Sequence, residues 1–461
     1  MSARRGRALA VGFAVTGQAV ARVLVAEGYS VSAVDDAVAT EAMRAAAARL
    51  GVDLVSRPRR EELAALGASA DLVVLSPGVR PDHLVFELVP GEKIVAEVEL
   101  AARLCEAPIV AITGTNGKTT VTSLVTEILR QAGVRAEAVG NIGRPFVEAA
   151  TEKDAELFVL EVSSFQLSWT KRFHPFVACW LNFAEDHLDW HRDLDEYAAA
   201  KARIFANQGP DDVAVVNAGD PVVMGFARRF GGRLCTFGPE GADSREEKGR
   251  LVGPDGVICT VDELPRALPH DLENALAAAA VALAAGADPG ALRPALSRGV
   301  PMPHRIELVA EHRGVRYYDD SKATTPSAVL AALAGFDSVV LVAGGRNKGL
   351  DLGAIARGLE AAGGPGDGFD RLRGVVAIGE AAGEVAEVFG GRPLLPVRVA
   401  TSMSEAVEAA AALARPGDAV VLSPGCASFD WYRNYAERGE DFARLVREIT
   451  EKDHVEKGGV R

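Results

Sequence analysis

The stretch PIVAITGTNGKTT at residues 108–120 decides the fold. Its apolar first half predicts a buried strand, and the glycine-rich turn that comes next leads into a helix beginning at Lys118. Gly114 and Gly117 allow backbone N–H groups to face a phosphate, and the helix N-terminus adds its partial positive charge. The Lys118 ammonium would contact the terminal phosphates of a nucleotide, and the Thr119 hydroxyl would bind Mg²⁺. The stretch therefore predicts a nucleoside-triphosphate site in an α/β domain.

The loop has the short form GxxGK[ST], because Ile112 stands where the strict motif has a further glycine. We favour phosphate binding over a chance glycine-rich turn between a strand and a helix. The loop residues expected to contact ATP are Gly114, Thr115, Asn116, Gly117, Lys118, Thr119 and Thr120.

Acidic and histidine side chains come after the next predicted strands. The strand at residues 157–161 ends in Glu161, and the segment NFAEDHLDWH (182–191) comes after another strand end. Mg²⁺ prefers oxygen ligands, so a carboxylate is the natural first ligand and a histidine an unusual second one. We therefore predict that Glu161 and His187 bind Mg²⁺ beside the phosphate loop. The same segment also carries Glu185, Asp186 and Asp189.

The composition is that of a globular protein with several domains. A chain of 461 residues is long enough for about two to four cores. The formal charge of −13 argues against a broad nucleic-acid or anionic-membrane surface. The five cysteines are scattered, odd in number and without CxxC spacing, which predicts neither a disulfide framework nor a zinc site. We expect a cytoplasmic protein with no nucleic-acid partner and no membrane insertion.

The first 15 residues, MSARRGRALAVGFAV, resemble a signal peptide because arginines precede an apolar run. We interpret them instead as a first strand that turns into a helix, because a full alternation of strands and helices continues from this point to about residue 95. This alternation predicts a parallel, Rossmann-like unit. No export is expected.

A nicotinamide cofactor is not expected in this first unit. The dinucleotide motif needs a central glycine so that the pyrophosphate can approach the backbone, and Ala14 puts a methyl group there. A nucleotide-diphosphate ligand fits equally well. Asp35 ends the second predicted strand, about where an acid would bind a ribose.

Two further α/β units complete the chain. In the second unit we predict strands at 157–162, 176–183 and 212–217, a surface loop at 238–250 and a closing helix at 271–286. The segment PMPHR (301–305) resembles a hinge between domains because it carries two prolines. The third unit has three polar loops that should lie at one sheet edge, where doubly wound folds bind ligands. These loops are 317–326, 343–349 and 423–435, and they bring Asp320, Lys322, Thr324, Lys348 and Ser428.

Taken together, these residues resemble the Mur ligases over nearly the whole chain. The motifs that occur in family order are TGTNGKTT (113–120), LEVSSFQL (160–167), AEDHLD (184–189), ENALAA (273–278), PHR (303–305) and DSKAT (320–324). GNIG (140–143) and SPGCASFD (423–430) resemble the branch of the family that adds D-glutamate.

The resemblance implies an α/β protein of three domains and an ATP-dependent ligase. Residues 1–96 would form a Rossmann-like domain for the UDP substrate, 97–300 a central P-loop ATPase-like domain, and 301–461 a Rossmann-like domain that receives the amino acid. The implied substrates are UDP-N-acetylmuramoyl-L-alanine and D-glutamate, the implied cofactors are ATP and Mg²⁺, and we expect a monomer. An acyl phosphate formed from ATP would be the intermediate. The alternatives are a Mur-type ligase for another amino acid and a ligase resembling folylpolyglutamate synthase.

The resemblance also implies roles for single residues. Lys201 would be carbamylated and would bind a second Mg²⁺. Asn274, Arg305 and Asp320 would contact ATP. The residues expected to contact the sugar-nucleotide or D-glutamate are Thr16, Asp35, Gly78, Asn141, His187, Thr324, Lys348, Ser428 and Tyr435.

The chain departs from the family pattern at three places. Asp36-Ala37 stands where the D-glutamate-adding branch often has Thr-Arg at its uridine pocket. Asp271 replaces a common asparagine, and Tyr435 stands where phenylalanine is expected. The first departure puts the usual uracil contacts in question.

Overall fold

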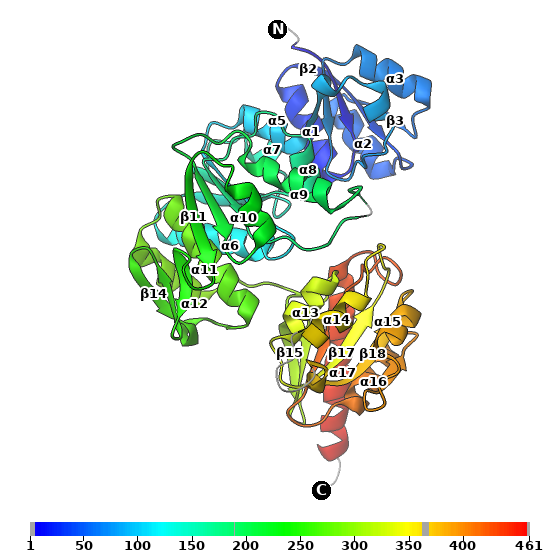
Figure 1. Ribbon diagram of the computed structural model, residues 1–461. Coiled ribbons are helices and arrows are strands. Elements are labelled where there is room, and N and C mark those ends of the chain that lie inside the picture. The colour runs from blue at the N-terminus through cyan, green and yellow to red at the C-terminus, as the bar shows by residue number, and fades with distance from the viewer. Residues whose placement is uncertain (1–4, 189, 362–367, 459–461) are drawn as a thin grey trace. The chain divides into compact units, whose positions relative to one another are not determined.

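The computed structural model describes residues 5–188, 190–361 and 368–458 (Figure 1). The chain forms two compact units. The first comprises residues 1–183, 190–267 and 271–300, and the second comprises 184–189, 268–270 and 301–461. Each unit is α/β, with sheets that are mainly parallel, which confirms the predicted fold class.

The first sheet of unit one has five parallel strands in the order β3-β2-β1-β4-β5. Its strands are β1 (Gly6–Val11), β2 (Tyr29–Asp35), β3 (Asp53–Ser56), β4 (Leu72–Leu75) and β5 (Ile94–Ala96). The connecting helices are α1 (Val15–Ala26), α2 (Glu41–Leu50), α3 (Arg60–Ser69) and α4 (Val85–Leu88). The Rossmann-like alternation predicted from the sequence is thus present, and Asp35 ends β2 as predicted.

The second sheet of unit one has nine strands in the order β14-β13-β12-β11-β10-β9-β6-β8-β7. Its strands are β6 (Ile109–Thr113), β7 (Ala136–Gly140), β8 (Leu157–Glu161), β9 (Val177–Trp180), β10 (Val213–Asn217), β11 (Arg233–Gly238), β12 (Ser244–Glu247), β13 (Arg250–Gly253) and β14 (Gly256–Thr260). Its helices are α5 (Glu97–Leu104), α6 (Lys118–Gln131), α7 (Phe146–Ala149), α8 (Ser164–Ser168), α9 (Leu194–Ala202), α10 (Pro221–Ala227), α11 (Pro269–Ala284) and α12 (Leu292–Arg298).

The strand β6 is buried on both faces, as its run of apolar residues predicts. Ile109 and Ala111 pack into a core that also contains residues of α7 and α9, whereas Val110 and Ile112 pack into a core with α6 and α11. The first of these cores continues into the first sheet, where Ala8 joins it. The two sheets of unit one therefore share one continuous core.

The predicted surface loop at 238–250 is wrong over β12 and the adjoining strand ends. Residues Ser244–Glu247 pair in parallel with β11 and antiparallel with β13. The segment is polar, yet Ser244 is buried and Leu251 of the next strand reaches the core. Pairing with neighbouring strands outweighs its weak strand propensity.

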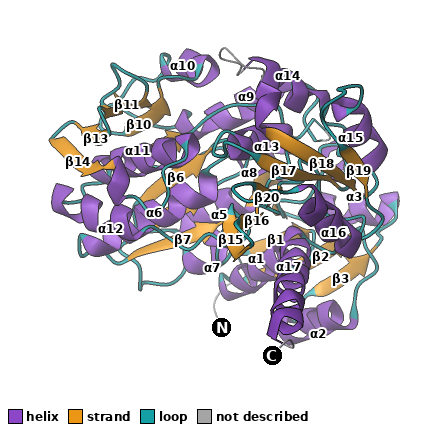
Figure 2. Ribbon diagram, turned by 90° about the horizontal axis from the view of Figure 1, so that it is seen from below, coloured by secondary structure: helices purple, strands orange, loops and turns teal. Residues whose placement is uncertain are grey.

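The second unit has one six-stranded sheet in the order β15-β16-β20-β17-β18-β19, and only β15 is antiparallel to its neighbour (Figure 2). Its strands are β15 (Glu307–His312), β16 (Val315–Asp319), β17 (Val339–Gly344), β18 (Leu372–Ile378), β19 (Val397–Val399) and β20 (Ala419–Leu422). Its helices are α13 (Pro326–Leu333), α14 (Gly353–Ala361), α15 (Ala382–Phe389), α16 (Met403–Leu413) and α17 (Tyr435–Gly458).

Helices cover both faces of this sheet. Leu341 of β17 packs into a core with α13, α14 and α15, and its neighbour Val342 packs into a core with α16 and α17. The carboxyl ends of β16, β17 and β20 therefore open toward the loops that the sequence marks as polar. Among the described residues, no helix combines the length and the apolar character that a membrane crossing requires.

Candidate active site

The phosphate loop has the backbone that its glycines predict. Gly117 is the N-cap of α6 and has φ +83°, a conformation that other residues rarely adopt. A Cβ atom at Gly117 would lie 2.4 Å from Oδ1 of Asn274, and one at Gly114 would lie 2.9 Å from Cβ of Leu181. Both glycines are therefore required by close approach, and Asn274 lies directly against the loop.

Two amines meet the backbone of this loop. Nζ of Lys118 donates to the carbonyl oxygens of Gly114 (2.9 Å) and Thr115 (2.8 Å). Nζ of the buried Lys201, on α9, donates to the same Gly114 oxygen at 2.7 Å. Lys118 is thus folded back onto its own loop, and α9 places Lys201 beside it.

Asn182 and Tyr197 also contact the phosphate loop, although the sequence pattern does not single them out. Oδ1 of Asn182 accepts hydrogen bonds from the N–H groups of Thr115 (3.0 Å) and Asn116 (2.9 Å). The hydroxyl of the buried Tyr197 lies 3.3 Å from Oγ1 of Thr115. Asn182 lies inside the acidic segment 182–191, in which the sequence predicts a Mg²⁺ ligand. Tyr197 precedes Lys201 by one helical turn.

Glu161 ends β8 and presents an oxygen that suits a cation. Its Oε1 accepts a hydrogen bond from Nδ2 of Asn141 at 2.9 Å. Its Oε2 is buried, and none of the residues that the structure describes forms a hydrogen bond with it. A buried carboxylate oxygen without a partner is costly, so the residue fits a site for a metal ion. The contact also links Asn141, expected at the sugar-nucleotide, to Glu161, expected at Mg²⁺.

His187 has φ +57°, and its Nε2 lies 3.3 Å from Oδ2 of Asp186. His187 belongs to the second compact unit, whereas Glu161 and Lys201 belong to the first. A joint Mg²⁺ site of these residues stays a prediction. Glu185 is exposed, and Asp189 lies outside the described residues.

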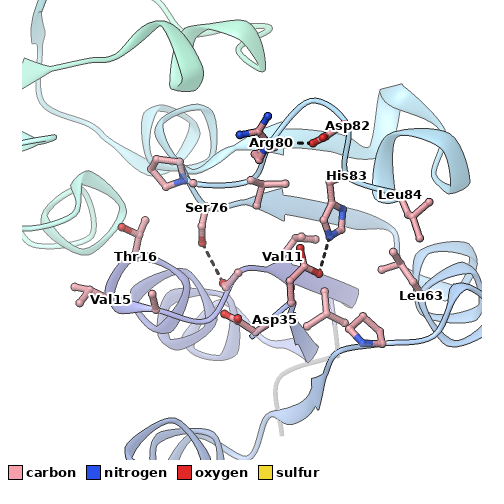
Figure 3. A pocket seen from close by; sticks show the side chains of 18 of the residues that line it. Val11, Val15, Thr16, Asp35, Leu63, Ser76, Arg80, Asp82, His83 and Leu84 are labelled. Carbon is pink, nitrogen blue, oxygen red and sulfur yellow. Dashed lines mark hydrogen bonds and ion pairs between the residues drawn. The ribbon is translucent and has the colours of Figure 1, made fainter. Parts of the chain in front are cut away.

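A pocket of about 790 Å³ lies at the carboxyl edge of the first sheet (Figure 3). Thr16, Asp35, Gly78 and Asn141, the four residues expected to contact the sugar-nucleotide in the first unit, all line it. In Figure 3, Thr16 lies toward one end of the pocket and Leu84 toward the other. The structure therefore brings together four residues that are distant in the sequence.

Asp35 holds two turns of this pocket in place. Its Oδ2 accepts from the N–H of Phe13 at 2.7 Å, and its Oδ1 accepts from the N–H of Ala37 at 2.9 Å. The Ser76 hydroxyl donates to the Gly12 carbonyl oxygen at 3.0 Å from the other side of β1. These bonds fix the turns after β1, β2 and β4 around one cavity.

The departure at Asp36 places a new polar pair in the pocket. Oδ1 of Asp36 lies 3.2 Å from Nε2 of His83, and Nδ1 of His83 accepts from the N–H of Val85 at 3.0 Å. Because Nδ1 is an acceptor, Nε2 carries the proton and donates to Asp36. The pair joins the turns after β2 and β4, and both residues line the cavity. Figure 3 draws this contact as a dashed line from His83.

The three polar loops at 317–326, 343–349 and 423–435 meet, as predicted. The N–H of Gly425 donates to the Ala323 carbonyl oxygen at 2.9 Å, which joins the loops after β20 and β16. The N–H of Arg346 donates to the Ala427 carbonyl oxygen at 2.8 Å, and the N–H of Ala427 donates back at 3.0 Å, which joins the loops after β17 and β20.

A buried arginine on α17 ties these loops together. The Arg438 guanidinium donates to the hydroxyl and carbonyl oxygens of Ser321 (2.9 and 2.8 Å) and to the carbonyl oxygen of Cys426 (3.1 Å). A Cβ atom at Gly345 would lie 3.0 Å from its Nη1. Burial lowers the pKa of Arg438 to about 10, so it remains protonated near neutral pH.

Asp320, expected to contact ATP, is buried at the end of β16. Its Oδ2 accepts from the Ser423 hydroxyl at 2.8 Å. Burial raises the pKa of Asp320 to about 7, and the charge of Arg305 acts in the opposite direction. The adjacent Asp319 accepts a 2.7 Å hydrogen bond from Nδ1 of His304, in the predicted hinge segment.

The residues expected to contact D-glutamate differ in exposure. Ser428 is buried, Thr324 is half-buried, and Lys348 is exposed with Nζ 6.0 Å from the centre of the Phe429 ring. Tyr435 is 38% exposed. All four lie on the loops that meet at this sheet edge or, for Tyr435, at the start of α17.

Comparison with known proteins identifies the family of the chain. The profile of the Mur ligase middle domain matches residues 112–282, and that of the Mur ligase glutamate ligase domain matches residues 304–426. The UDP-N-acetylmuramoylalanine–D-glutamate ligase of Geobacter metallireducens is 40% identical over 456 residues, covering 96% of this chain and 97% of that protein. The enzyme of the same name from Thermobifida fusca is also 40% identical, covering 96% of this chain and 99% of that protein.

Solved structures share the fold at low sequence identity. A UDP-N-acetylmuramate–alanine ligase from Thermotoga maritima is 18% identical with a TM-score of 0.59, covering 96% of this chain and all of that chain. A MurF from Acinetobacter baumannii is 19% identical with a TM-score of 0.61, covering 96% of this chain and 92% of that chain. The two profile matches, the near full-length relatives and the phosphate-loop geometry together show that the chain belongs to the Mur ligase family of ATP-dependent, amide-bond-forming ligases.

Proposed function

We propose that this protein joins D-glutamate to UDP-N-acetylmuramoyl-L-alanine with hydrolysis of ATP, a step in the synthesis of peptidoglycan precursors. The observation that carries the proposal is the 40% identity, over 96% of the chain, to relatives named for this reaction. The pocket at Thr16, the phosphate loop and the polar loops of the second unit offer one site for each of the three substrates. We assign the reaction to the cytoplasm because two of its three substrates are nucleotides, and we assign it to a monomer.

Each substrate is assigned to one segment of the chain. Residues 1–96 hold the UDP group together with Asn141, 97–300 hold ATP together with Arg305 and Asp320, and 301–461 hold D-glutamate. Each segment has its own sheet, and each sheet has its polar loops at the carboxyl ends of parallel strands. The residues 301–305 are assigned the role of a hinge, and exclusion of water would protect an acyl phosphate from hydrolysis.

The reaction requires activation of a carboxylate, because an oxide ion cannot leave when an amine attacks. The γ-phosphoryl group of ATP is transferred to an oxygen of the alanyl carboxylate, which breaks the bond to ADP and forms an acyl phosphate. The neutral amine of D-glutamate then attacks the acyl carbon, and the tetrahedral intermediate expels phosphate and loses a proton.

The phosphate loop and its neighbours stabilise the charge of this transfer. The N–H groups at the start of α6 and the Lys118 ammonium hold the phosphates of ATP. Asn274, which contacts Gly117, and Arg305 and Asp320 complete the ATP site. Mg²⁺, bound by Thr119, Glu161, His187 and a carbamylated Lys201, would neutralise the charge where phosphates and carboxylate meet.

Carbamylation of Lys201 is consistent with its surroundings. The side chain is 1% exposed, and carbamylation joins CO₂ to the neutral form of a lysine amine. Its nitrogen lies 2.7 Å from the Gly114 oxygen, so a carboxylate added to it would lie close to the phosphate loop. The added negative charge is stabilised if a divalent cation is bound beside it.

The D-glutamate site is assigned to Thr324, Lys348, Ser428 and Tyr435. A dicarboxylate needs cationic and hydroxyl donors, and these residues supply an ammonium and three hydroxyl groups. A lysine near an exposed loop end can reach one carboxylate as a point charge. A site for lysine or diaminopimelate would need an additional acid for the distal amine.

Phosphate release tests the proposal. The purified protein is supplied with ATP, Mg²⁺ and UDP-N-acetylmuramoyl-L-alanine, together with D-glutamate, L-glutamate, L-lysine or diaminopimelate. We expect release with D-glutamate alone. Equal turnover with another amino acid would overturn the assignment of the amino acid, and turnover with a folate in place of the sugar-nucleotide would overturn that of the acceptor.

A further inference from the structure

Asn182 lies just after the end of β9, beside the phosphate loop, and its side chain contacts two consecutive residues of that loop. Oδ1 accepts from the N–H groups of Thr115 (3.0 Å) and Asn116 (2.9 Å), and Nδ2 donates to the Asn116 carbonyl oxygen at 3.2 Å. A single carboxamide therefore bonds to two N–H groups and one carbonyl oxygen in the first half of the loop.

Asn182 is itself held in place. The backbone carbonyl oxygen of Asn182 accepts a hydrogen bond from the N–H of Thr115 at 3.1 Å and another from Nε1 of Trp180 at 3.1 Å. Trp180 is completely buried in the core beneath the sheet. The carboxamide thus projects from a rigid backbone, which is the requirement for a side chain that positions another group.

Two N–H groups that converge on one oxygen form the kind of concave donor site that binds anions. In the phosphate loop, the side-chain amide oxygen of Asn182 is the acceptor at this site, and it carries no net charge. The first hydrogen bond inside α6 is donated by Val121 to the Gly117 oxygen (2.9 Å), and the N-terminus of this helix is where phosphate binding is expected.

We propose that Asn182 is a positioning residue for the ATP site, which shapes the first half of the phosphate loop without contacting the nucleotide. The inference rests on the proposed ATP-dependent function. With Asn182 in place, the loop keeps one conformation before ATP arrives, so binding does not have to order it. A neutral carboxamide performs this role without repelling the phosphates, whereas the negative charge of a carboxylate would repel them.

The test compares Asn182→Ala with the matched control Asn207→Ala. Nδ2 of Asn207 also bridges two carbonyl oxygens, those of Lys171 (3.0 Å) and Phe173 (2.9 Å), but it does so away from the phosphate loop. We expect Asn182→Ala to raise the KM for ATP at least tenfold and to leave the KM for D-glutamate within twofold. Asn207→Ala should leave both KM values within twofold, whatever it does to the melting temperature.

Hydrogen exchange of the ligand-free protein provides the second readout. In Asn182→Ala the amides of Thr115 and Asn116 should exchange at least tenfold faster, whereas Asn182→Asp keeps both acceptor contacts and should keep slow exchange. An unchanged KM for ATP in Asn182→Ala would overturn the inference. A raised KM with unchanged exchange would also overturn it, because Asn182 would then bind the nucleotide directly. If the wild-type protein does not bind ATP, the proposed function fails together with the inference.

Discussion

Glu97 should make the stability of the first unit depend on pH. It is the first residue of α5 and is 1% exposed. Its Oε1 accepts from the N–H of Val147 at 2.6 Å, and Gln166 donates to the carboxyl group as well. Burial raises the pKa of Glu97 from 4.5 to about 7, and these hydrogen bonds reduce the shift without cancelling it. The perturbation is Glu97→Gln, which keeps a carbonyl acceptor for Val147 and is neutral at every pH.

Proton binding determines the sign of this effect. Between the unfolded pKa of 4.5 and the folded pKa of about 7, the folded protein binds more protons than the unfolded chain. The contribution of Glu97 is therefore fully present below pH 4.5 and is lost as the pH rises through 7. The rise in its pKa from 4.5 to about 7 corresponds to about 3 kcal/mol. The free energy of unfolding of Glu97→Gln should therefore exceed that of the wild type by about 1 kcal/mol at pH 5, about 2 kcal/mol at pH 6 and about 3 kcal/mol at pH 8.

Urea unfolding of both proteins from pH 5 to pH 8 measures this difference, with the fluorescence of the tryptophans as the signal. Trp169, Trp180 and Trp190 lie in the first unit and Trp431 lies in the second, so the signal reports mainly the unfolding of the first unit. The difference between the two proteins removes the pH dependence of every other group. A gain that stays constant over this range, or a loss at pH 8, would refute the argument from burial.

Four further changes test the site. Lys118→Ala should reduce turnover at least a thousandfold with an unchanged melting temperature, and near wild-type turnover would disprove its role at the phosphates. Lys201→Ala should be nearly inactive and partly restored by a short carboxylic acid; carbon-13 NMR of the active enzyme that shows an unmodified amine would exclude carbamylation. Lys348→Ala should raise the KM for D-glutamate at least tenfold, a loss of about 1.5–3 kcal/mol, and should change that for ATP little. Arg438→Lys should lower the stability by about 3 kcal/mol in chemical unfolding, because one ammonium cannot reach both Ser321 and Cys426; an unchanged stability would show that those hydrogen bonds contribute little.

Elements with a clear local periodicity are the ones that the sequence predicts best. The strand before the phosphate loop and the helix beginning at Lys118 are where the motif indicates. The polar loops of the second unit meet because parallel strands present their carboxyl ends at one edge. The short strands β3, β5 and β19 have three or four residues each, which is too short for a periodic signal.

Residues whose role is to hold another segment were not predicted. Asn182 contacts Asn116, which precedes it by 66 residues, and Arg438 contacts Ser321, which precedes it by 117 residues. In the sequence, Arg438 resembles one of many charged residues on an amphipathic helix, and its burial depends on how α17 packs. The pairing of Asp36 with His83 is similar, because neither residue indicates a partner 47 residues away.

These residues explain how loops can carry a precise site in this fold. A loop at the end of a strand is free to move unless side chains from other elements hold it, and each of the three candidate sites has such a group. Asp35 fixes the turns of the sugar-nucleotide pocket, Asn182 the phosphate loop, and Arg438 the loops assigned to D-glutamate. Each of these groups bonds to backbone atoms, so the side chains at the surface of the site can vary without loss of its shape. The replacement of a common Thr-Arg by Asp36-Ala37 is tolerable for this reason, because the Ala37 N–H still bonds to Asp35 and the pocket keeps its wall.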